Sequence, residues 1–591
     1  MNNAEKLQAL RRLMQDNNLA AFIEVTGDDH QSEYFADHYR TLEWISNFSG
    51  ENSTVVVTPD KALIWADGRY WISCEKEIAG TEFQMMKMNW PNVPTVKEFL
   101  LTLPNGSRIG FNGAILPAQT INAYLRDFQA HDFELVDVDL IGQLWTADRP
   151  QVSKEQAWLH ELKFTGCRTA DKLADFRQRL KEKYADYSVI SSLDDICWLY
   201  NIRAFDIPCC PVLLSFALIT PEQAFLYADP DKIPTALAEN LQAEGVTLLP
   251  YEQIYQDIAA LPKTAKVYIQ SSMVNYRIYQ ILSSNYSLVD GINISTYQKA
   301  VKNPTEIANL KGIFLQDSAA ICKFMCWLDQ NIGKHEIKEL DCAAKLLEYR
   351  QEQEGFIEPS FETIAAYKDN AAMLHYSASV EKQAVLQNKS FFLHDSGGQY
   401  YGGTTDITRT QAVGPLTEEE IFDYTHVVKG CVDTMSARFL RGTTGISLDG
   451  ITRYPMWQTG TDYKSGTGHG VGYCLNVHEG PQSISTRSNQ VSLQLGMLTT
   501  VEPGIYKANK HGIRIENDVL TVKDCQNEHG EFYRFEIVSY VPFELRAIDK
   551  KYLTAAEIKW LNDYHQACYE KISPFLNENE KNWLKNATKA L

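Results

Sequence analysis

A gapless internal repeat constrains the fold of this chain more than any other feature of its sequence. Residues 55–67 (VVVTPDKALIWAD) align without insertion with residues 217–229 (ALITPEQAFLYAD). Both copies have the pattern of a strand, a turn with a proline, and a second strand. A solenoid needs at least three copies, and the sequence holds no third one. The repeat therefore predicts two related domains in tandem.

The segments that precede each copy support this interpretation. They follow the same order, which is a helical pattern, a short β-rich run and a segment with a tryptophan. These segments are residues 7–13, 21–25 and 44–46 in the first copy, and residues 173–180, 187–190 and 198–200 in the second. Charge and a proline interrupt the pattern near residues 147–150. We expect two α/β domains, over residues 1–149 and 150–302.

A third region begins where the repeats end. Asn303 is suited to cap a helix, Pro304 to open it and Glu306 to complete the cap, and apolar residues follow at helical spacing. From residue 361 to residue 541 the sequence changes to short strands and glycine-rich turns, and the last forty residues have a helical pattern again. We expect residues 303–591 to form one further domain with a helical C-terminal extension.

Composition narrows the classes of function. Of the 591 residues, 44% are hydrophobic and 22% charged, which is typical of a soluble globular protein. The net charge of −19 repels phosphate backbones and anionic lipids, so we expect no nucleic-acid and no membrane partner. The twelve cysteines are scattered, which suits a reducing compartment. The first residues lack the basic and apolar segments of a secretory signal, so we expect a cytoplasmic protein.

Four carboxylates and one imidazole stand in apolar or glycine-rich runs of the third region. They are Asp395, Asp406, His469, Glu502 and Glu516. An unpaired carboxylate buried in such surroundings costs many kcal/mol, so these groups must be protonated, ion-paired or metal-bound. Four negative charges and one imidazole match a pair of divalent cations, whose four positive charges leave only a bound hydroxide in excess. The hard oxygen-rich ligand set favours Mn²⁺, or Co²⁺, over structural zinc.

The segment around Asp406 has a distinctive alternation. Residues 404–410 (TTDITRT) have period two, so Thr404, Asp406, Thr408 and Thr410 are predicted to share one face of a strand. That face meets either water or a polar site. By the same argument His394 points away from Asp395 and takes no part in the site.

The third region resembles the pita-bread metallopeptidases of the methionine aminopeptidase and aminopeptidase P group. The resemblance rests on the five residues above and on the runs around them, such as GTGHGVG at 466–472 and VEPGIY at 501–506. It continues along the whole chain, which is similar to the long, three-domain cytosolic Xaa-Pro aminopeptidases. The motifs outside the third region that carry it are residues 28–34, 66–70 and 193–199, and residues 561–565 carry it near the C-terminus.

The resemblance implies a multidomain fold of the α+β and α/β classes, with two creatinase-like α/β domains followed by a pita-bread catalytic domain. It implies that Asp395, Asp406, His469, Glu502 and Glu516 hold two metal ions, with manganese as the metal. It also implies that His375 and His478 contact the substrate and the tetrahedral intermediate. Arg69 and Asp28 are candidates for contacts with the ends of the peptide, and a homodimer is expected.

The predicted reaction is release of the N-terminal residue from peptides with proline in the second position. A hydroxide that bridges the two metals would attack, and Glu502 would carry the proton to the departing nitrogen. Two positions depart from the family pattern. Ser465 stands where many relatives have a further histidine, and Gly402 stands where relatives have an aspartate.

Three alternatives share parts of this pattern. A prolidase restricted to dipeptides would use the same metal ligands. A creatinase would need no metal, so it has no use for all five ligands. A non-catalytic pita-bread module that binds peptides or proteins would keep the fold and lose the metal site.

Overall fold

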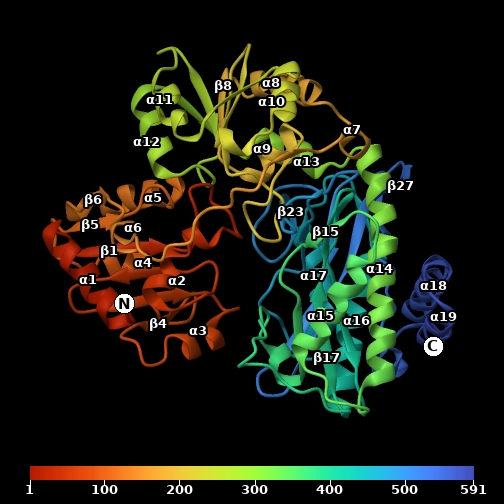
Figure 1. Ribbon diagram of the computed structural model, residues 1–591. Coiled ribbons are helices and arrows are strands. Elements are labelled where there is room, and N and C mark those ends of the chain that lie inside the picture. The colour runs from red at the N-terminus through yellow and green to blue at the C-terminus, as the bar shows by residue number, and fades with distance from the viewer. The chain divides into compact units, whose positions relative to one another are not determined.

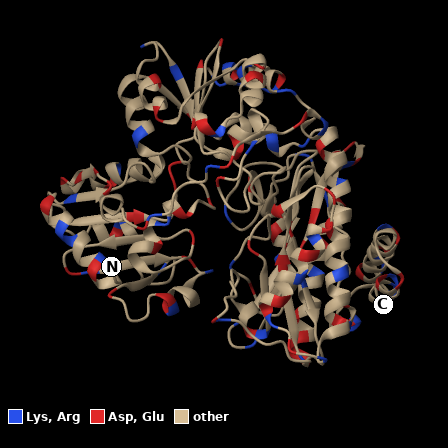
Figure 2. Cartoon of the chain, in the orientation of Figure 1, with Lys and Arg blue, Asp and Glu red and all other residues tan.

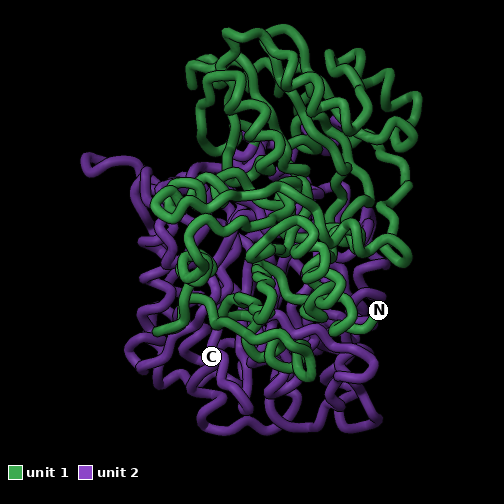
Figure 3. Tube along the Cα trace, turned by 90° about the vertical axis from the view of Figure 1, so that its left-hand side faces the viewer, with its two compact units in different colours: residues 1–160, 167–295 green, residues 161–166, 296–591 purple.

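The computed structural model describes residues 1–591, which form two compact units. Unit 1 contains residues 1–160 and 167–295, and unit 2 contains residues 161–166 and 296–591 (Figure 3). Acidic and basic residues are interspersed along the elements of both units (Figure 2). None of the helices combines the length and the apolar character needed to cross a membrane.

Unit 1 holds two six-stranded sheets. The strands of the first sheet are β1 (Ala21–Val25), β2 (Thr54–Val57), β3 (Ala62–Ala66), β4 (Gln84–Lys87), β5 (Arg108–Phe111) and β6 (Glu134–Asp137). The strands of the second are β8 (Tyr187–Ile190), β10 (Ser215–Ile219), β11 (Ala224–Ala228), β12 (Val246–Pro250), β13 (Lys266–Ile269) and β14 (Ser287–Asp290). The short strands β7 (Trp158–Leu159) and β9 (Ile202–Arg203) pair with each other.

Helices accompany both sheets (Figure 1). With the first sheet go α1 (Asn3–Asp16), α2 (Thr41–Ser46), α3 (Trp71–Glu77), α4 (Val96–Leu100), α5 (Ala118–Phe128) and α6 (Leu140–Leu144). With the second go α8 (Thr169–Glu182), α9 (Leu193–Leu199), α10 (Thr235–Ala243), α11 (Ile254–Ala259) and α12 (Tyr276–Asn285). The helix α13 (Ile294–Ala300) leads into unit 2.

The two sheets have the same topology. Their strand orders are β4-β3-β2-β1-β5-β6 and β12-β11-β10-β8-β13-β14. Corresponding strand pairs also run in the same directions. The pairs β1–β2 and β2–β3 are antiparallel, and so are the pairs β8–β10 and β10–β11. The hairpins β2–β3 and β10–β11 lie in the two copies of the sequence repeat. The prediction of two related α/β domains in tandem is confirmed.

Unit 2 is built from curved antiparallel strands and long helices. Its strands are β15 (Phe356–Pro359), β16 (Ile364–Tyr367), β17 (Phe391–Ser396), β18 (Gly398–Tyr400), β19 (Gly403–Thr404), β20 (Ile407–Ala412), β21 (Arg438–Leu440), β22 (Gly468–Gly470), β23 (Glu479–Ile484), β24 (Leu498–Val501), β25 (Gly504–Lys507), β26 (His511–Arg514), β27 (Asn517–Asn527) and β28 (Gly530–Ile537). Its helices are α7 (Leu162–Thr165), α14 (Pro304–Asn331), α15 (Glu339–Gln351), α16 (Glu418–Met435), α17 (Gly445–Trp457), α18 (Ala555–Ile572) and α19 (Glu578–Ala587).

Two of the sheets in unit 2 carry the candidate site. One has the order β16-β17-β20 and the other the order β21-β28-β27-β24-β22-β23. The helix α14 begins as the sequence predicts, because the Asn303 side chain accepts hydrogen bonds from the first-turn amides and Glu306 completes the capping box. The C-terminal helices α18 and α19 pack against α14, which accounts for their apolar face.

Candidate metal centre

The five predicted ligands lie on or beside strands of unit 2. Asp395 is on β17, Asp406 stands directly before β20, and His469 is in the middle of β22. Glu502 follows β24 directly and Glu516 precedes β27 directly. The ladder between β24 and β27 ends with the pair Val501 and Asn517, so the two glutamates leave the sheet at the same end. Residues that are far apart in the sequence are thus brought to one place.

The ligand atoms of these residues form groups of the size that a metal ion needs. The carboxylate oxygens of Asp395, Asp406 and Glu516 lie within 4.8 Å of one another, and so do the ligand atoms of His469, Glu502 and Glu516. Glu516 belongs to both groups, and the two groups together contain all five predicted ligands. Two adjacent groups that share a carboxylate fit two cations that share a bridging ligand.

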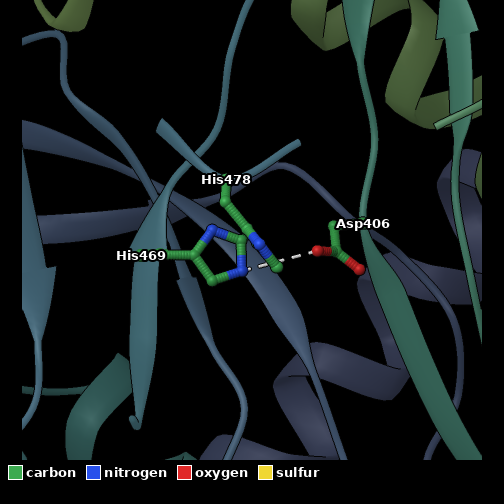
Figure 4. Close-up of side chains that lie close together, drawn as sticks. All are labelled: Asp406, His469 and His478. Carbon is green, nitrogen blue, oxygen red and sulfur yellow. Dashed lines mark ion pairs between the residues drawn. The ribbon is translucent and has the colours of Figure 1, made fainter. Parts of the chain in front are cut away.

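His469 is oriented as a ligand. Its Nδ1 lies 2.8 Å from the Gly470 carbonyl oxygen, so Nδ1 carries the proton and Nε2 keeps its lone pair. That Nε2 lies 3.5 Å from Asp406 Oδ2 (Figure 4). It also lies 3.5 Å from Glu502 Oε1. The His478 ring stands edge-on to the His469 ring, with 4.3 Å between the ring centroids. The ligand atoms of His478, His469 and Asp406 lie within 4.8 Å of one another, so His478 is at the centre. Its predicted contact with a substrate stays a prediction.

The carboxylates are held in an unfavourable environment for negative charge. Burial, and then the Asp395 carboxylate, raises the pKa of Asp406 well above its usual range. Burial, and then Asp406, does the same to the pKa of Glu516, and burial raises the pKa of Glu502. Two of the buried oxygens, Asp395 Oδ1 and Glu516 Oε1, have no hydrogen-bond partner. Buried carboxylate oxygens without partners, in residues whose ligand atoms lie within 4.8 Å of one another, fit a site for divalent cations.

Sequence reasoning missed the arginine of the site. Arg514 on β26 donates to Asp395 Oδ2 through Nη2 at 2.5 Å and through Nε at 3.2 Å, and its Nη1 donates to the Tyr506 hydroxyl at 2.8 Å. It supplies one positive charge against four carboxylates. The signal was present in the sequence, because Arg514 and Glu516 stand two residues apart in a run with period two.

The threonine-rich segment meets a polar site and not water. Thr404, Thr408 and Thr410 are all buried. The Thr408 hydroxyl donates to Glu516 Oε2 at 2.8 Å, and the Glu516 amide donates to the Thr408 carbonyl at 3.1 Å. One detail differs from the prediction, since β20 begins at Ile407 and leaves Asp406 just outside the ladder. Since β19 ends at Thr404, Asp406 lies in the two-residue break between β19 and β20.

His394 is separated from the site. Its ring packs between Phe324 and Phe392 and is buried, and neither ring nitrogen has a hydrogen-bond partner. Burial lowers the pKa of His394 to about 3, so the ring is neutral. This packing is what the alternation along β17 predicts for the residue beside Asp395.

The other predicted site residues have the following surroundings. His375 lies three residues after a 3₁₀ helix, η5 (Lys368–Ala372), which packs against β17, β25 and β26. Arg69 and Asp28 belong to unit 1. Arg69 forms an ion pair with Asp67 at 2.7 Å, and Asp28 is buried and accepts hydrogen bonds from the His30 and Ser32 amides. Their predicted contacts with a peptide stay predictions.

The two departures from the family pattern have local consequences. Gly402, in the turn between β18 and β19, packs against α14, and a Cβ added there would lie 3.0 Å from the Ile313 side chain. A larger residue at this position would need Ile313 to move. Ser465 is held through its carbonyl, which accepts from Arg453 Nη2 at 2.7 Å.

Comparisons with known proteins agree with this arrangement. Residues 6–143 and 148–306 each match a Creatinase/Prolidase N-terminal domain family, residues 313–523 match metallopeptidase family M24, and residues 531–591 match the C-terminal region of peptidase M24. Aminopeptidase P2 of Arabidopsis thaliana is 35% identical over 99% of this chain and 88% of its own length. The chain belongs to the Xaa-Pro aminopeptidase family. It is a hydrolase of the metallopeptidase class, as the sequence predicts.

Further relatives extend over the same length. Xaa-Pro aminopeptidase 1 of Dictyostelium discoideum is 34% identical over 100% of this chain and 96% of its own. The crystal structure of X-prolyl aminopeptidase from Caenorhabditis elegans, described as a cytosolic enzyme with a di-nuclear active site, superposes with a TM-score of 0.96 at 32% identity and covers 100% of both chains. The predicted fold class, two creatinase-like domains before a pita-bread domain, is confirmed. The exact domain boundaries stay predictions.

Proposed function

We propose that this member of the Xaa-Pro aminopeptidase family releases the N-terminal residue from peptides that have proline in the second position. The observation that carries the proposal is the convergence of five ligand side chains into two groups that share Glu516. The relatives that match the whole chain carry the names aminopeptidase P and Xaa-Pro aminopeptidase. A prolidase restricted to dipeptides would need a different peptide site around the same ligands.

The proposed metal ligands are Asp395, Asp406, His469, Glu502 and Glu516, which would hold two divalent cations. Four carboxylates and one imidazole form a hard ligand set, which supports Mn²⁺ as the metal. The di-nuclear active site of the Caenorhabditis elegans relative supports the number of two. When bound, the cations would lower the pKa of a coordinated water molecule and polarise the carbonyl of the scissile bond.

The chain's own residues would then complete the reaction. Glu502 takes a proton from the attacking water and passes it to the proline nitrogen, while the new carbon–oxygen bond forms and the carbon–nitrogen bond breaks. His478, whose ring lies against His469, is placed to hold the oxyanion that develops on the carbonyl. His375 is the second candidate for this contact and for holding the substrate. Arg69 and Asp28 are proposed to reach the ends of the peptide.

The need for a dedicated enzyme follows from the substrate. The amide before proline has no N–H, and the pyrrolidine ring fixes φ and crowds the leaving group. A peptide site that relied on that N–H would fail on such a bond. We place the enzyme in the cytosol, which the description of the Caenorhabditis elegans relative supports. The net charge of −19 supports a partner that is a peptide and not a nucleic acid.

A homodimer is the proposed assembly, and the outward side of α17 supports it. Four apolar side chains of this helix, Ile446, Ile451, Tyr454 and Trp457, are each between 41% and 59% exposed. A contiguous group of large apolar side chains on a helix is typical of a protein–protein contact. Light scattering should give twice the chain mass for the wild-type protein and one chain mass for a Tyr454→Glu/Trp457→Glu variant. A wild-type monomer would contradict the proposal.

The proposed activity is tested directly with peptides. Protein loaded with Mn²⁺ is incubated with an Arg-Pro-Pro tripeptide, a longer peptide with proline second, an Xaa-Pro dipeptide and a matched peptide with alanine in place of proline. Mass spectrometry should show loss of one N-terminal residue from the proline peptides of every length and none from the alanine control. Cleavage of the dipeptide alone would make the protein a prolidase, and no cleavage would favour a binding module.

A further inference from the structure

Glu339 is a fully buried carboxylate that binds four separate points of one segment. It is the first residue of α15, and its side chain is completely shielded from solvent. Oε1 accepts from the Tyr367 amide at 2.7 Å and from Asn370 Nδ2 at 2.9 Å. Oε2 accepts from the Tyr376 hydroxyl at 2.7 Å and from the Ala384 amide at 2.6 Å. All four donors lie between residues 367 and 384, in the segment that contains His375.

The donors surround His375 along the chain. Tyr367 and Asn370 stand before it, Tyr376 follows it directly, and Ala384 closes the segment. The Asn370 side chain also donates to the Tyr376 hydroxyl at 3.0 Å, so the two sides of His375 are linked to each other as well as to Glu339. Between Tyr367, which ends β16, and Ala384, η5 is the only helix or strand. Glu339 thus replaces the regular hydrogen bonding that the segment lacks.

Neutral groups, and not basic side chains, contact the Glu339 carboxylate. The partners of the Glu339 carboxylate are neutral donors, and the N-terminus of α15 adds a favourable dipole. A buried carboxylate without a cation is costly, and an apolar residue that filled the same space would avoid that cost. The carboxylate holds the segment in a single conformation, because one side chain accepts hydrogen bonds from four donors at once.

The opposite side of the segment is held by strands of the metal centre. Gly512 on β26 approaches it so closely that an added Cβ would lie 1.7 Å from the Ala371 carbonyl oxygen. Ala371 and Ala366 form an apolar cluster with Leu393, which is two residues from Asp395, and Tyr376 packs against that cluster. His375 therefore lies in a segment clamped between Glu339 and the strands that carry the proposed metal ligands.

We infer that Glu339 is a positioning residue that sets the place of His375 relative to the metal centre through the hydrogen bonds to Tyr367, Asn370, Tyr376 and Ala384. This inference rests on the proposed function, in which His375 contacts the substrate. A Glu339→Gln variant tests it. The new amide group would face the Ala384 N–H, donor against donor, so one bond is lost while the volume is kept.

The measurement is a double-mutant cycle with His375→Ala, made on the Mn²⁺-loaded full chain with an Xaa-Pro tripeptide. Glu339→Gln should lower kcat/KM about tenfold and divide the loss between kcat and KM as His375→Ala does. In the His375→Ala background the same change should cost less than about twofold, because Glu339 acts through the imidazole. Bound metal and melting temperature should stay close to those of the wild type.

A matched control and a second variant protect the result. Glu348→Gln changes an exposed glutamate of the same helix, which pairs only with Lys345, and should leave kcat/KM unchanged. If Glu339→Gln does not fold, Tyr376→Phe removes one donor, and about a threefold loss that vanishes without His375 is expected. If Glu339→Gln still lowered kcat/KM about tenfold in the His375→Ala background, the positioning role of Glu339 would be overturned. Wild-type protein that cleaves no Xaa-Pro peptide would overturn the proposed function instead.

Discussion

Two groups of buried carboxylates in unit 2 differ in how their charge is balanced. In the first, Asp317 on α14 faces Arg350 on α15, with 2.7 Å between Oδ1 and Nε and 3.0 Å between Oδ2 and Nη2, and both side chains are buried. The Tyr400 hydroxyl adds a hydrogen bond to Asp317 at 2.8 Å. This pair is neutral within the chain. In the metal centre, four carboxylates meet one guanidinium, that of Arg514, and one imidazole.

The difference teaches what the metal centre is built for. Asp317 is buried with a counter-charge from Arg350, and Glu339 is buried with four neutral donors, so each of these carboxylates has partners within the chain. At the centre the chain leaves an excess of negative charge and two oxygens without partners. Such an arrangement is stable only when cations are supplied from outside or when the groups take up protons. Substitutions in the two regions should therefore have different effects: those at the metal centre on activity and metal binding, and those at the Asp317–Arg350 pair on stability.

The largest effect is expected from Asp406→Ala. The change removes a carboxylate that belongs to a proposed ligand group, so kcat/KM for an Xaa-Pro tripeptide should fall by at least about a thousandfold. His394→Ala is the matched control, because that ring packs on the far side of β17 and should leave activity within about threefold. Comparable losses in the two variants would mean that the faces of β17 have been assigned wrongly.

Asp317→Asn should affect stability instead of catalysis. It leaves the Arg350 guanidinium buried without a charged partner, which costs about 3–5 kcal/mol of the free energy of unfolding. Both cations should still bind. A double change of Asp317→Leu and Arg350→Met should recover most of the lost stability, as measured by urea denaturation. If the folded Asp317→Asn protein lost its metal, the claim that Asp317 acts on stability and not on the metal centre would be wrong.

Glu502→Gln should lower kcat by about a hundredfold to a thousandfold, because the amide cannot carry the proton from water to the leaving nitrogen. The amide is also a weaker metal ligand, so the Kd for the cations should rise. Steady-state kinetics at saturating Mn²⁺ separates the two effects. A rate near that of the wild type under these conditions would remove Glu502 from proton transfer.

The smallest effect concerns pH and metal removal together. The pKa values of Asp406 and Glu516 are raised in the folded chain by burial and by their neighbours. For a raised pKa, the stabilising contribution is complete below the unfolded-state value, which is about 3.9 for Asp and about 4.3 for Glu, and is lost as pH rises through the folded-state value. Protein treated with a chelator should therefore lose stability from mildly acidic pH toward pH 8.

Metal-loaded protein should behave differently, since the cations bind the deprotonated groups and release their protons. The difference in unfolding free energy between loaded and chelated protein should grow by about 1.4 kcal/mol per pH unit for each proton released. Thermal unfolding at a series of pH values measures it. A difference that stays constant or shrinks with pH would show that the buried carboxylates are not coupled to the metal.

Sequence reasoning found those parts of the molecule that repeat or that break a local rule. The repeat predicted the common topology of the two sheets because a hairpin is a local structure. The five proposed ligands were singled out because each puts a charge or an imidazole into an apolar or glycine-rich run, where burial is expected. The first residue of β20 was not predicted, because β20 begins where its pairing with β17 ends, at Ile407.

The residues that were missed act through contacts across long stretches of chain. Arg514 binds Asp395 over 119 residues, so the alternation that places Arg514 near Glu516 does not reveal its partner. Glu339 stands in a run of charged residues (HEIKELD, 335–341) that is typical of an exposed helix start, yet it is fully buried. Its partners at 367–384 become visible only when the segment folds back onto α15.

The central claim is that five side chains of unit 2 bind two divalent cations. The most direct test is to count the bound ions. The purified chain is dialysed against Mn²⁺, and the metal content per chain is measured by inductively coupled plasma mass spectrometry. The account predicts two ions per chain for the wild type and fewer for Asp406→Ala and Glu516→Gln, with His394→Ala unchanged. A wild-type chain that binds no ion, or variants that still bind two, would contradict it.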